Sequence, residues 1–326
     1  MKIAFFSTQP YDKEYFERYN KHHVITFFDA QLNEQTVNLI QGCDAVCCFV
    51  NDRLHAGVVN SLAEMGVKII ALRCAGFNNV DLVAAKENQI AVVRVPAYSP
   101  HAVAEHALAL IMALNRKTHK AYNRVREGNF SLNRLTGFDL YGKSVGVIGT
   151  GKIGQCFARI MQGLGCKVLA FDLIANSDLE KKGVKYLALT DLLEQSDIIS
   201  LHCPLTEPTK HLINKTSLDI MKDGVMLINT SRGGLIDTKA TINALKRGKL
   251  GYLGIDVYEQ EEKLFFHDFS ENIIEDEVIM RLMSFPNVLV TAHQGFLTNE
   301  ALTQIALVTL QNLDDFQKGK ILENAV

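Results

Sequence analysis

Long apolar runs, a strong net charge and internal repeats are all missing from this sequence of 326 residues. The longest apolar run, residues 107–114, is far too short to span a bilayer, so we expect no membrane partner. The formal net charge is -2 and the basic residues are scattered, so no global field attracts nucleic acid. Residues 1–6 lack the pattern of a signal peptide, and we therefore expect a cytoplasmic protein.

Cysteine is present, but its spacing does not predict disulfides. There are seven cysteines, an odd number without regular spacing, which favours a reducing compartment. Cys43, Cys47 and Cys48 lie close together, and the last two fall in an apolar run, 45–50, that predicts a buried strand. Adjacent strand side chains point to opposite faces, so we interpret these thiols as small buried hydrophobes. We expect no metal site in the chain.

Short β-rich runs alternate with helical patterns almost throughout the chain. The length favours two domains, and 48% hydrophobic with 21% charged residues is typical of a globular protein. Near-continuous apolar strands separated by helices indicate parallel sheets covered on both faces. We expect strands at 2–6, 24–28, 45–50, 67–72 and 90–93, and a second series at 144–148, 167–171, 198–201, 225–229, 253–257 and 288–291.

A long helical stretch at 100–124 separates the two series of strands, and an amphipathic helix at 299–318 closes the chain. The predicted fold class is therefore α/β, with two doubly wound parallel-sheet domains and a cleft between them. One is a Rossmann-type nucleotide domain, and the other is a flavodoxin-like substrate domain that precedes it in the sequence.

A glycine-rich fingerprint marks the expected cofactor site. Residues 149–154 read G-T-G-K-I-G, which matches G-x-G-x-x-G, and they stand between a predicted strand and a predicted helix at 155–164. Gly149 permits the tight turn, Gly151 lets the backbone approach a pyrophosphate, and Gly154 lets helix and strand pack closely. The amino end of the helix then faces the phosphates.

Asp172 stands at the end of the next predicted strand, eighteen residues after Gly154. A carboxylate at this point accepts hydrogen bonds from ribose hydroxyls. It also repels a 2′-phosphate, so we expect NAD as the cofactor and not NADP. An ordinary acid at a strand end is the plain alternative.

Three later segments, 229–237, 254–261 and 291–294, follow predicted strands, where doubly wound folds bind ligands. An arginine fork suits the carboxylate of a 2-oxo acid, and a histidine can donate a proton to the developing alkoxide. A carboxylate behind the histidine orients the ring and favours its charged form. Taken singly, each of these residue types has an ordinary structural explanation: the arginine as a surface residue, the glutamate as the start of a helix and the histidine as a core residue.

The order and spacing of these segments resemble the D-isomer-specific 2-hydroxyacid dehydrogenase family over essentially the whole chain, and most closely its bacterial fermentative D-lactate dehydrogenases. Further stretches that carry the resemblance read ALRCAGFNNVD at 71–81, VRVPAY at 93–98, AVAEH at 102–106 and SLHCPLT at 200–206. The resemblance implies an oxidoreductase that reversibly reduces pyruvate, a 2-oxo acid, to D-lactate with NADH.

The resemblance also implies the roles of particular residues. Arg232 is expected to bind substrate, His293 to act as acid and base, and Glu261 to be its partner in preference to Glu259 or Glu262. The residues expected to bind substrate are Cys74, Ala75, Gly76, Tyr98 and Phe296. Those expected to bind NAD are Gly149, Gly151, Lys152, Ile153, Gly154, Asp172, Cys203, Pro204, Thr209, Thr230, Ser231 and Asp256. His101, His106 and His202 are interpreted as packing or polar-surface residues.

By the same resemblance, residues 1–100 plus 299–326 form the substrate domain and residues 101–298 the NAD-binding domain. Family members form homo-oligomers, so we expect a dimer or tetramer. The segment 259–286 is either a lid or patch over the nucleotide domain or a packed surface loop, and the sequence leaves both open.

Two other functions fit the sequence less well. The first is a dehydrogenase of another D-2-hydroxy acid, such as glycerate, hydroxyisocaproate or phosphoglycerate; only Arg73 and Arg94 are plausible partners for a substrate phosphate. The second is an NAD-sensing, non-catalytic corepressor-like protein, although no partner-binding extension is visible.

Overall fold

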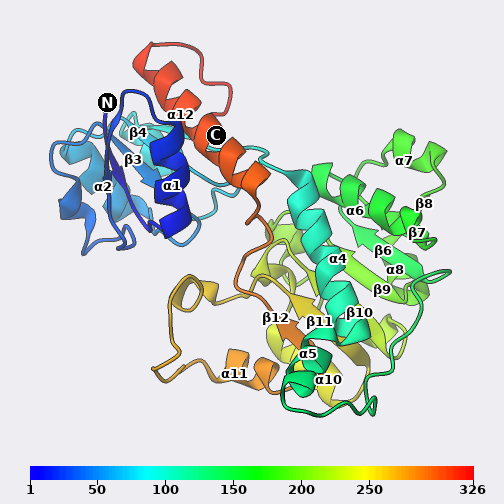
Figure 1. Cartoon of the computed structure of the whole chain (residues 1–326). Coiled ribbons are helices and arrows are strands. Elements are labelled where there is room, and N and C mark those ends of the chain that lie inside the picture. The colour runs from blue at the N-terminus through cyan, green and yellow to red at the C-terminus, as the bar shows by residue number, and fades with distance from the viewer. The chain divides into compact units, whose positions relative to one another are not determined.

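The computed structural model describes the backbone of residues 1–326 and every side chain except that of Lys263. The chain divides into two compact units, which are described separately. The first unit comprises Met1–Ser99 and Leu297–Val326, and the second comprises Pro100–Phe296. Figure 1 traces the chain through both.

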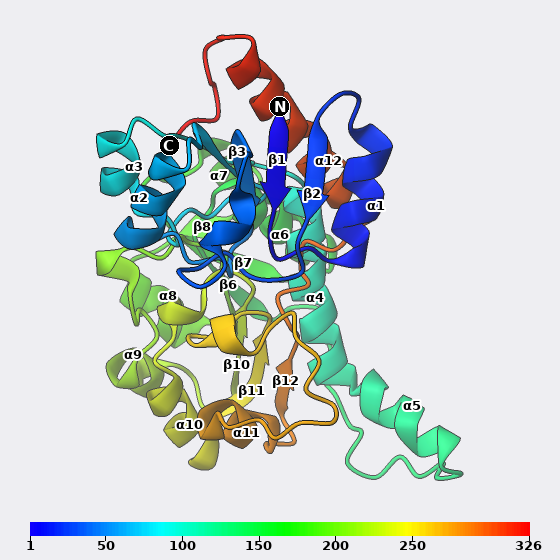
Figure 2. The ribbon, with the colours of Figure 1, turned by 90° about the vertical axis from the view of Figure 1, so that its left-hand side faces the viewer.

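The first unit contains a five-stranded parallel sheet in the order β2-β1-β3-β4-β5, which is the flavodoxin-like order. Helices α1 and α12 pack together on one side of this sheet, and α2 and α3 lie on the other (Figure 2). Strands β3 and β4 are buried along their whole length, because helices cover both faces. The elements are β1 (Lys2–Phe5), α1 (Pro10–Tyr19), β2 (Val24–Phe27), η1 (Val37–Ile40), β3 (Ala45–Cys48), α2 (Ala56–Glu64), β4 (Ile69–Leu72), α3 (Leu82–Glu87), β5 (Ala91–Val93) and α12 (Asn299–Gln317).

The second unit contains a seven-stranded parallel sheet in the order β12-β11-β10-β9-β6-β7-β8. This is the doubly wound nucleotide-binding order with one further strand at an edge, and the strand order reverses between β6 and β9. The strands are β6 (Ser144–Ile148), β7 (Lys167–Phe171), β8 (Lys185–Tyr186), β9 (Ile198–Leu201), β10 (Val225–Asn229), β11 (Leu250–Ile255) and β12 (Val288–Val290). The predicted fold class is confirmed in both units.

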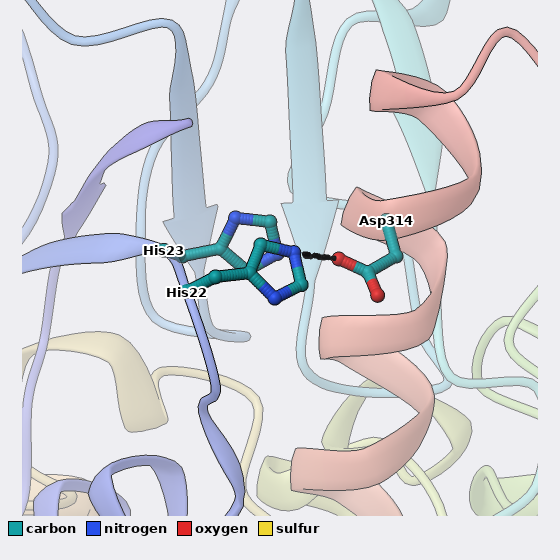
Figure 3. A group of neighbouring side chains, drawn as sticks. All are labelled: His22, His23 and Asp314. Atoms are coloured by element: carbon teal, nitrogen blue, oxygen red, sulfur yellow. Dashed lines mark ion pairs between the residues drawn. The ribbon is translucent and has the colours of Figure 1, made fainter.

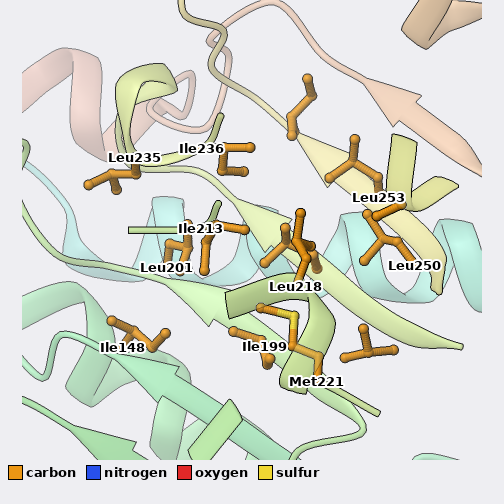
Figure 4. Packing of buried hydrophobic residues seen from close by; sticks show 14 of the residues in the cluster. Ile148, Ile199, Leu201, Ile213, Leu218, Met221, Leu235, Ile236, Leu250 and Leu253 are labelled. Atoms are coloured by element: carbon orange, nitrogen blue, oxygen red, sulfur yellow. The ribbon is translucent and has the colours of Figure 1, made fainter. Parts of the chain in front are cut away.

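Two apolar clusters cover the two faces of this larger sheet. One joins the sheet to α4 and α6, and the other joins it to α8, α9, α10 and α11. Figure 4 shows part of the second cluster, where Leu218 and Met221 lie beside Ile199 of β9. The helical elements are α4 (Pro100–Arg116), α5 (Thr118–Arg126), α6 (Lys152–Gly163), α7 (Ser177–Lys181), α8 (Leu189–Gln195), η2 (Glu207–Thr209), α9 (Lys215–Ile220), η3 (Gly233–Leu235), α10 (Thr238–Lys246), η4 (Glu261–Lys263) and α11 (Glu277–Met283).

The predicted helix at 100–124 is wrong in one respect, because the chain forms two helices there. Lys117 adopts a left-handed conformation with φ +51° between α4 and α5. Its ammonium group donates to the carbonyl oxygens of Arg134 (3.1 Å) and Thr136 (2.8 Å), which holds the break in place. Two further boundaries differ by three residues: α6 begins at Lys152 and β11 begins at Leu250, each three residues before the predicted start.

The segment 259–286 packs against the second unit. Phe265 is 7% exposed and belongs to an apolar cluster of this unit, with Leu264 and Phe266 against it. Asp276 accepts a hydrogen bond of 2.9 Å from the hydroxyl of Tyr258 and caps the start of α11. These contacts favour the packed-loop interpretation.

Among the described helices, none is long and apolar enough to cross a membrane.

Candidate active site

The glycine fingerprint forms the turn between β6 and α6. Gly149 has φ +93°, and a Cβ there would lie 2.7 Å from the backbone of His202 and Cys203. A Cβ on Gly154 would collide with the carbonyl oxygen of Gly149. Gly151 differs, because a Cβ there would meet nothing within 4 Å. The first and third glycines are therefore required by packing, whereas the second keeps an open space beside the backbone.

That open space lies at the amino end of α6. The helix begins at Lys152, its N-cap residue is a glycine, Gly151, and its first turn contains no acidic residue. The first N–H groups of a helix lack partners within the helix and carry partial positive charge. A phosphate group fits this cradle, as the fingerprint predicts.

Asp172 lies beside the same turn, directly after β7. Its Oδ2 accepts hydrogen bonds from the N–H (2.5 Å) and the hydroxyl (3.0 Å) of Thr150, and Tyr186 donates to that hydroxyl (2.9 Å). The carboxylate is thus held at the edge of the glycine turn. A negative charge in this place suits a ribose and disfavours a ribose phosphate.

Residues after β9 and β10 border the point where the strand order reverses. Burial raises the pKa of Cys203 to about 11, so its thiol stays protonated, and its carbonyl accepts a 2.6 Å hydrogen bond from the Ser231 hydroxyl. Thr209 donates to the carbonyl of the exposed Pro204 (2.7 Å). The Thr230 hydroxyl is buried without a hydrogen-bond partner among the described residues. A buried hydroxyl without a partner, such as that of Thr230 at the end of β10, fits a site for a polar ligand such as a dinucleotide.

Arg232 follows β10 and is half-buried. Its Nη1 donates to the carbonyl of Ser231 (2.7 Å), and no described carboxylate forms an ion pair with its guanidinium. The next residue must be glycine, because a Cβ on Gly233 would collide with the backbone of Tyr258 and Glu259. This close approach brings the Arg232 loop against the segment that carries the candidate acids.

His293 and Glu261 form an ion pair in the second unit. Nδ1 of His293 lies 2.9 Å from Oε1 of Glu261, and the two side chains are 15% and 20% exposed. The other carboxylate oxygen of Glu261 accepts a 2.9 Å hydrogen bond from the N–H of Tyr258. The carboxylate is therefore oriented from behind, and it fixes the ring through Nδ1, which leaves Nε2 as the nitrogen for proton exchange.

The neighbouring acid Glu259 is engaged elsewhere. Its two carboxylate oxygens contact Nε2 of His211 (2.7 Å) and the N–H of Thr238 (3.1 Å). Glu262 is exposed. Of the three acids that the sequence offers, Glu261 is the one that contacts His293.

Asp256 holds the segment around His293. It is 1% exposed, and its carboxylate accepts hydrogen bonds from the Thr291 hydroxyl (2.6 Å) and from the N–H groups of Gln294 and Gly295 (2.8 Å each). The N–H of His293, which has a left-handed φ of +53°, donates to the carbonyl of Asp256 (2.8 Å). These bonds over-determine a backbone conformation that a non-glycine residue rarely adopts.

His106, interpreted from the sequence as a packing or polar-surface residue, belongs to this network. Its Nε2 lies 3.1 Å from the Thr291 hydroxyl and 3.3 Å from Oδ1 of Asp256. Burial favours the protonated form of Asp256, but the hydrogen bonds from His106 and Thr291 and the nearby imidazoles outweigh it and lower the pKa. No signal in the sequence alone links His106 in α4 to a residue 150 positions later.

The predicted substrate loop lies in the first unit, directly after β4. The thiol of Cys74, which is 5% exposed, donates to the carbonyl of Gly76 (3.2 Å), and the carbonyl of Ala75 accepts from Arg94 (2.8 Å). Tyr98 is half-buried in the same unit, and Phe296 is 6% exposed at the end of the second. Their contribution to substrate binding stays a prediction.

The two basic residues considered for a substrate phosphate have other contacts. Arg73 is 1% exposed, forms an ion pair with Asp12 (3.3 Å) and lies between the rings of Phe5 and Phe49. It is a core residue. Arg94 lies over the ring of Phe77 in addition to its bond with Ala75. This arrangement disfavours a phosphorylated substrate.

Known proteins match this chain over its whole length. Residues 108–295 match the family model of the D-isomer specific 2-hydroxyacid dehydrogenase, NAD binding domain. The D-lactate dehydrogenase of Escherichia coli is 54% identical, with 99% of this chain and 99% of the relative covered. The apo-structure of D-lactate dehydrogenase from Escherichia coli has a TM-score of 0.92 at 52% sequence identity, with 100% of both chains covered. A D-lactate dehydrogenase from Aquifex aeolicus, complexed with NAD and lactic acid, has a TM-score of 0.87 at 34% sequence identity and covers 99% of this chain and 98% of that one.

The match to the family model covers more than half of the chain and includes the glycine turn, Asp172, Arg232, Glu261 and His293. The resemblance inferred from the sequence is confirmed, and NAD is the cofactor of the matched domain. The chain belongs to the D-isomer specific 2-hydroxyacid dehydrogenase family of NAD-dependent oxidoreductases.

Proposed function

We propose that this protein is an NAD-dependent D-lactate dehydrogenase that reversibly reduces pyruvate to D-lactate. The 2.9 Å pair of His293 and Glu261 carries the proposal, because reduction of a carbonyl needs a proton donor that is held in one orientation. The 54% identity to a D-lactate dehydrogenase supports the choice of substrate among the 2-oxo acids.

Proton transfer is the task proposed for His293. Protonated at Nε2, the ring donates to the carbonyl oxygen of pyruvate as hydride reaches the carbonyl carbon, and in the reverse direction the neutral ring accepts the hydroxyl proton. The carboxylate of Glu261 stabilises the imidazolium and keeps the ring from rotating. Both states of the ring are therefore used, one in each direction.

Substrate orientation is the task proposed for Arg232. Its planar guanidinium can make two parallel hydrogen bonds to the substrate carboxylate, which fixes the carbonyl and polarises it. Gly233 keeps this loop against the Tyr258 backbone, so the arginine and the Glu261 segment are held by the same contact.

NADH, when bound, supplies the hydride. The amino end of α6 beside Gly151 would hold its pyrophosphate, and Asp172 would accept hydrogen bonds from the adenosine ribose. The residues that would border the rest of the cofactor are Lys152, Ile153, Cys203, Pro204, Thr209, Thr230, Ser231 and Asp256.

We further propose that the protein is a homo-oligomer and lies in the cytoplasm.

A panel of 2-oxo acids tests the proposed substrate. Initial rates of NADH oxidation would be measured with pyruvate, hydroxypyruvate, 4-methyl-2-oxopentanoate and 3-phosphohydroxypyruvate. We expect the highest kcat/KM with pyruvate, because misfit of even one methylene changes the barrier by about 1–3 kcal/mol. A higher value with the branched or phosphorylated acid would assign the protein to another D-2-hydroxy acid, and no NADH oxidation at all would favour a non-catalytic NAD sensor.

Cofactor choice gives a second prediction. The double substitution Asp172→Asn with Leu173→Arg should raise kcat/KM for NADPH by about 10- to 100-fold, since one charge-assisted hydrogen bond is worth about 1.5–3 kcal/mol. Asn keeps an acceptor for the Thr150 N–H, and Leu173 is 94% exposed, so the fold should tolerate both changes. The wild type should prefer NADH; equal use of both cofactors by the wild type would remove Asp172 from this role.

His106 gives a third prediction, as a positioning residue. His106→Phe removes the nitrogen that contacts Asp256 and Thr291, so the His293 segment should lose part of its support. We expect kcat to fall by about 10- to 100-fold. His106→Gln, whose amide can reach the same partners, should restore most of the activity. The measurement is kcat and its pH profile for both variants beside thermal unfolding; equal kcat in all three proteins would exclude the role.

A further inference from the structure

We infer that the first unit contains a binding site for a divalent transition-metal ion, formed by His22, His23 and Asp314. The two histidines follow α1 and the aspartate lies in α12, nearly 300 residues later. One ligand atom from each side chain lies within 4.8 Å of the others. Figure 3 shows both imidazole rings facing the carboxylate from one side.

The geometry converges on one oxygen atom. Nε2 of His22 lies 2.7 Å and Nε2 of His23 lies 2.9 Å from the same atom, Oδ1 of Asp314. Despite these distances, Nε2 of His23 and Oδ1 of Asp314 are buried without a hydrogen bond of acceptable geometry among the described residues. The side chain of His23 is 1% exposed. A buried nitrogen and a buried oxygen that face each other without a hydrogen bond fit an ion coordinated by both.

The surroundings orient these ligands. Asn20 accepts hydrogen bonds from the N–H groups of His22 (3.3 Å) and His23 (3.0 Å) and donates to the carbonyl of His23 (2.8 Å). The amino group of Met1 lies 3.4 Å from Nδ1 of His23, which leaves Nε2 for the site. Lys318 contacts the other carboxylate oxygen, Oδ2, at 3.3 Å. Contacts of this kind fix the orientation of metal ligands in known sites.

The donor set defines the class of ion. The two imidazole nitrogens are borderline ligands that suit Zn²⁺ and its neighbours, which also accept a carboxylate oxygen, whereas Ca²⁺ and Mg²⁺ prefer oxygen ligands throughout. Three protein ligands leave a fourth position to water. The side chain of His22 is 47% exposed, so an ion can enter from solvent. Bound there, the ion connects the turn after α1 to α12 and stabilises the first unit.

The test is titration of the untagged, chelator-treated protein with ZnCl₂, followed by calorimetry and by thermal unfolding. Wild type should bind one equivalent at this site and unfold at a higher temperature with zinc. His22→Asn and Asp314→Asn should each weaken this binding by about tenfold or more and lose the thermal shift. His55→Asn is the matched control, because His55 is 50% exposed and its Nε2 lies 3.5 Å from the carboxylate of Glu34 on the surface.

Retention of zinc binding by His55→Asn together with its loss in the two site variants would support the site. Circular dichroism of each variant without metal shows whether it is folded. Zinc affinity unchanged in both His22→Asn and Asp314→Asn, or no binding by the wild type, would overturn the inference.

Discussion

We expect His293→Gln to lower kcat for pyruvate reduction and for lactate oxidation by about 10²- to 10⁴-fold, the contribution of a positioned acid or base. Glutamine keeps polar groups near Glu261 but cannot donate a proton as an acid. NADH binding, measured by fluorescence titration, should survive. His211→Gln is the matched control, since His211 forms a similar 2.7 Å pair with Glu259. Loss of activity in the His211 variant with retention in the His293 variant would contradict the assignment.

The pH dependence of the two directions distinguishes proton transfer from mere packing. Reduction needs the protonated ring and should decline as pH rises, whereas oxidation needs the neutral ring and should increase. Glu261→Gln removes the charge that stabilises the imidazolium. The pH at which reduction declines and the pH at which oxidation increases, the two limbs of the pH profile, should therefore both be lower. Glu259→Gln should move neither. His202 cannot produce these limbs, because burial lowers its pKa to about 3.

Arg232→Lys should lower kcat/KM for pyruvate by about 10²- to 10³-fold, the usual cost of removing a group that stabilises charge in the transition state. Lysine keeps the positive charge but loses the two parallel hydrogen bonds of the guanidinium. NADH affinity should remain, because Arg232 is proposed to contact substrate.

Arg247→Lys serves as the control for this substitution, since Arg247 is 53% exposed and pairs with Asp219 on the surface. Steady-state kinetics with pyruvate would be compared for both variants. Near-normal efficiency of Arg232→Lys would remove Arg232 from the substrate site.

The strand pattern and the glycine fingerprint predict most of the fold, because buried parallel strands and the β6–α6 turn have strong local signatures. The break at Lys117 escapes prediction because the carbonyl groups that its ammonium group contacts, those of Arg134 and Thr136, lie 17 and 19 residues later and leave no mark on the local pattern. Strand β8 has only two residues, Lys185 and Tyr186, too few to show a period.

The candidate site is less predictable than the fold, because its contacts join distant segments. The residue pattern alone leaves Glu259, Glu261 and Glu262 as neighbouring candidates. The family resemblance selects Glu261, and the structure shows that this carboxylate contacts His293 while Glu259 contacts His211. The contact between His106 and Asp256 likewise depends on α4 lying beside the end of β11. The periodicity of the sequence indicates only that His106 is one more residue of a long apolar helix.

The chirality of the lactate formed from pyruvate and NADH tests the central claim most directly. The product of a complete reaction would be separated on a chiral column and compared with both lactate enantiomers. The proposed function predicts D-lactate in an amount equal to the NADH consumed. Formation of L-lactate or of a racemic mixture, or NADH consumption without lactate, would contradict it.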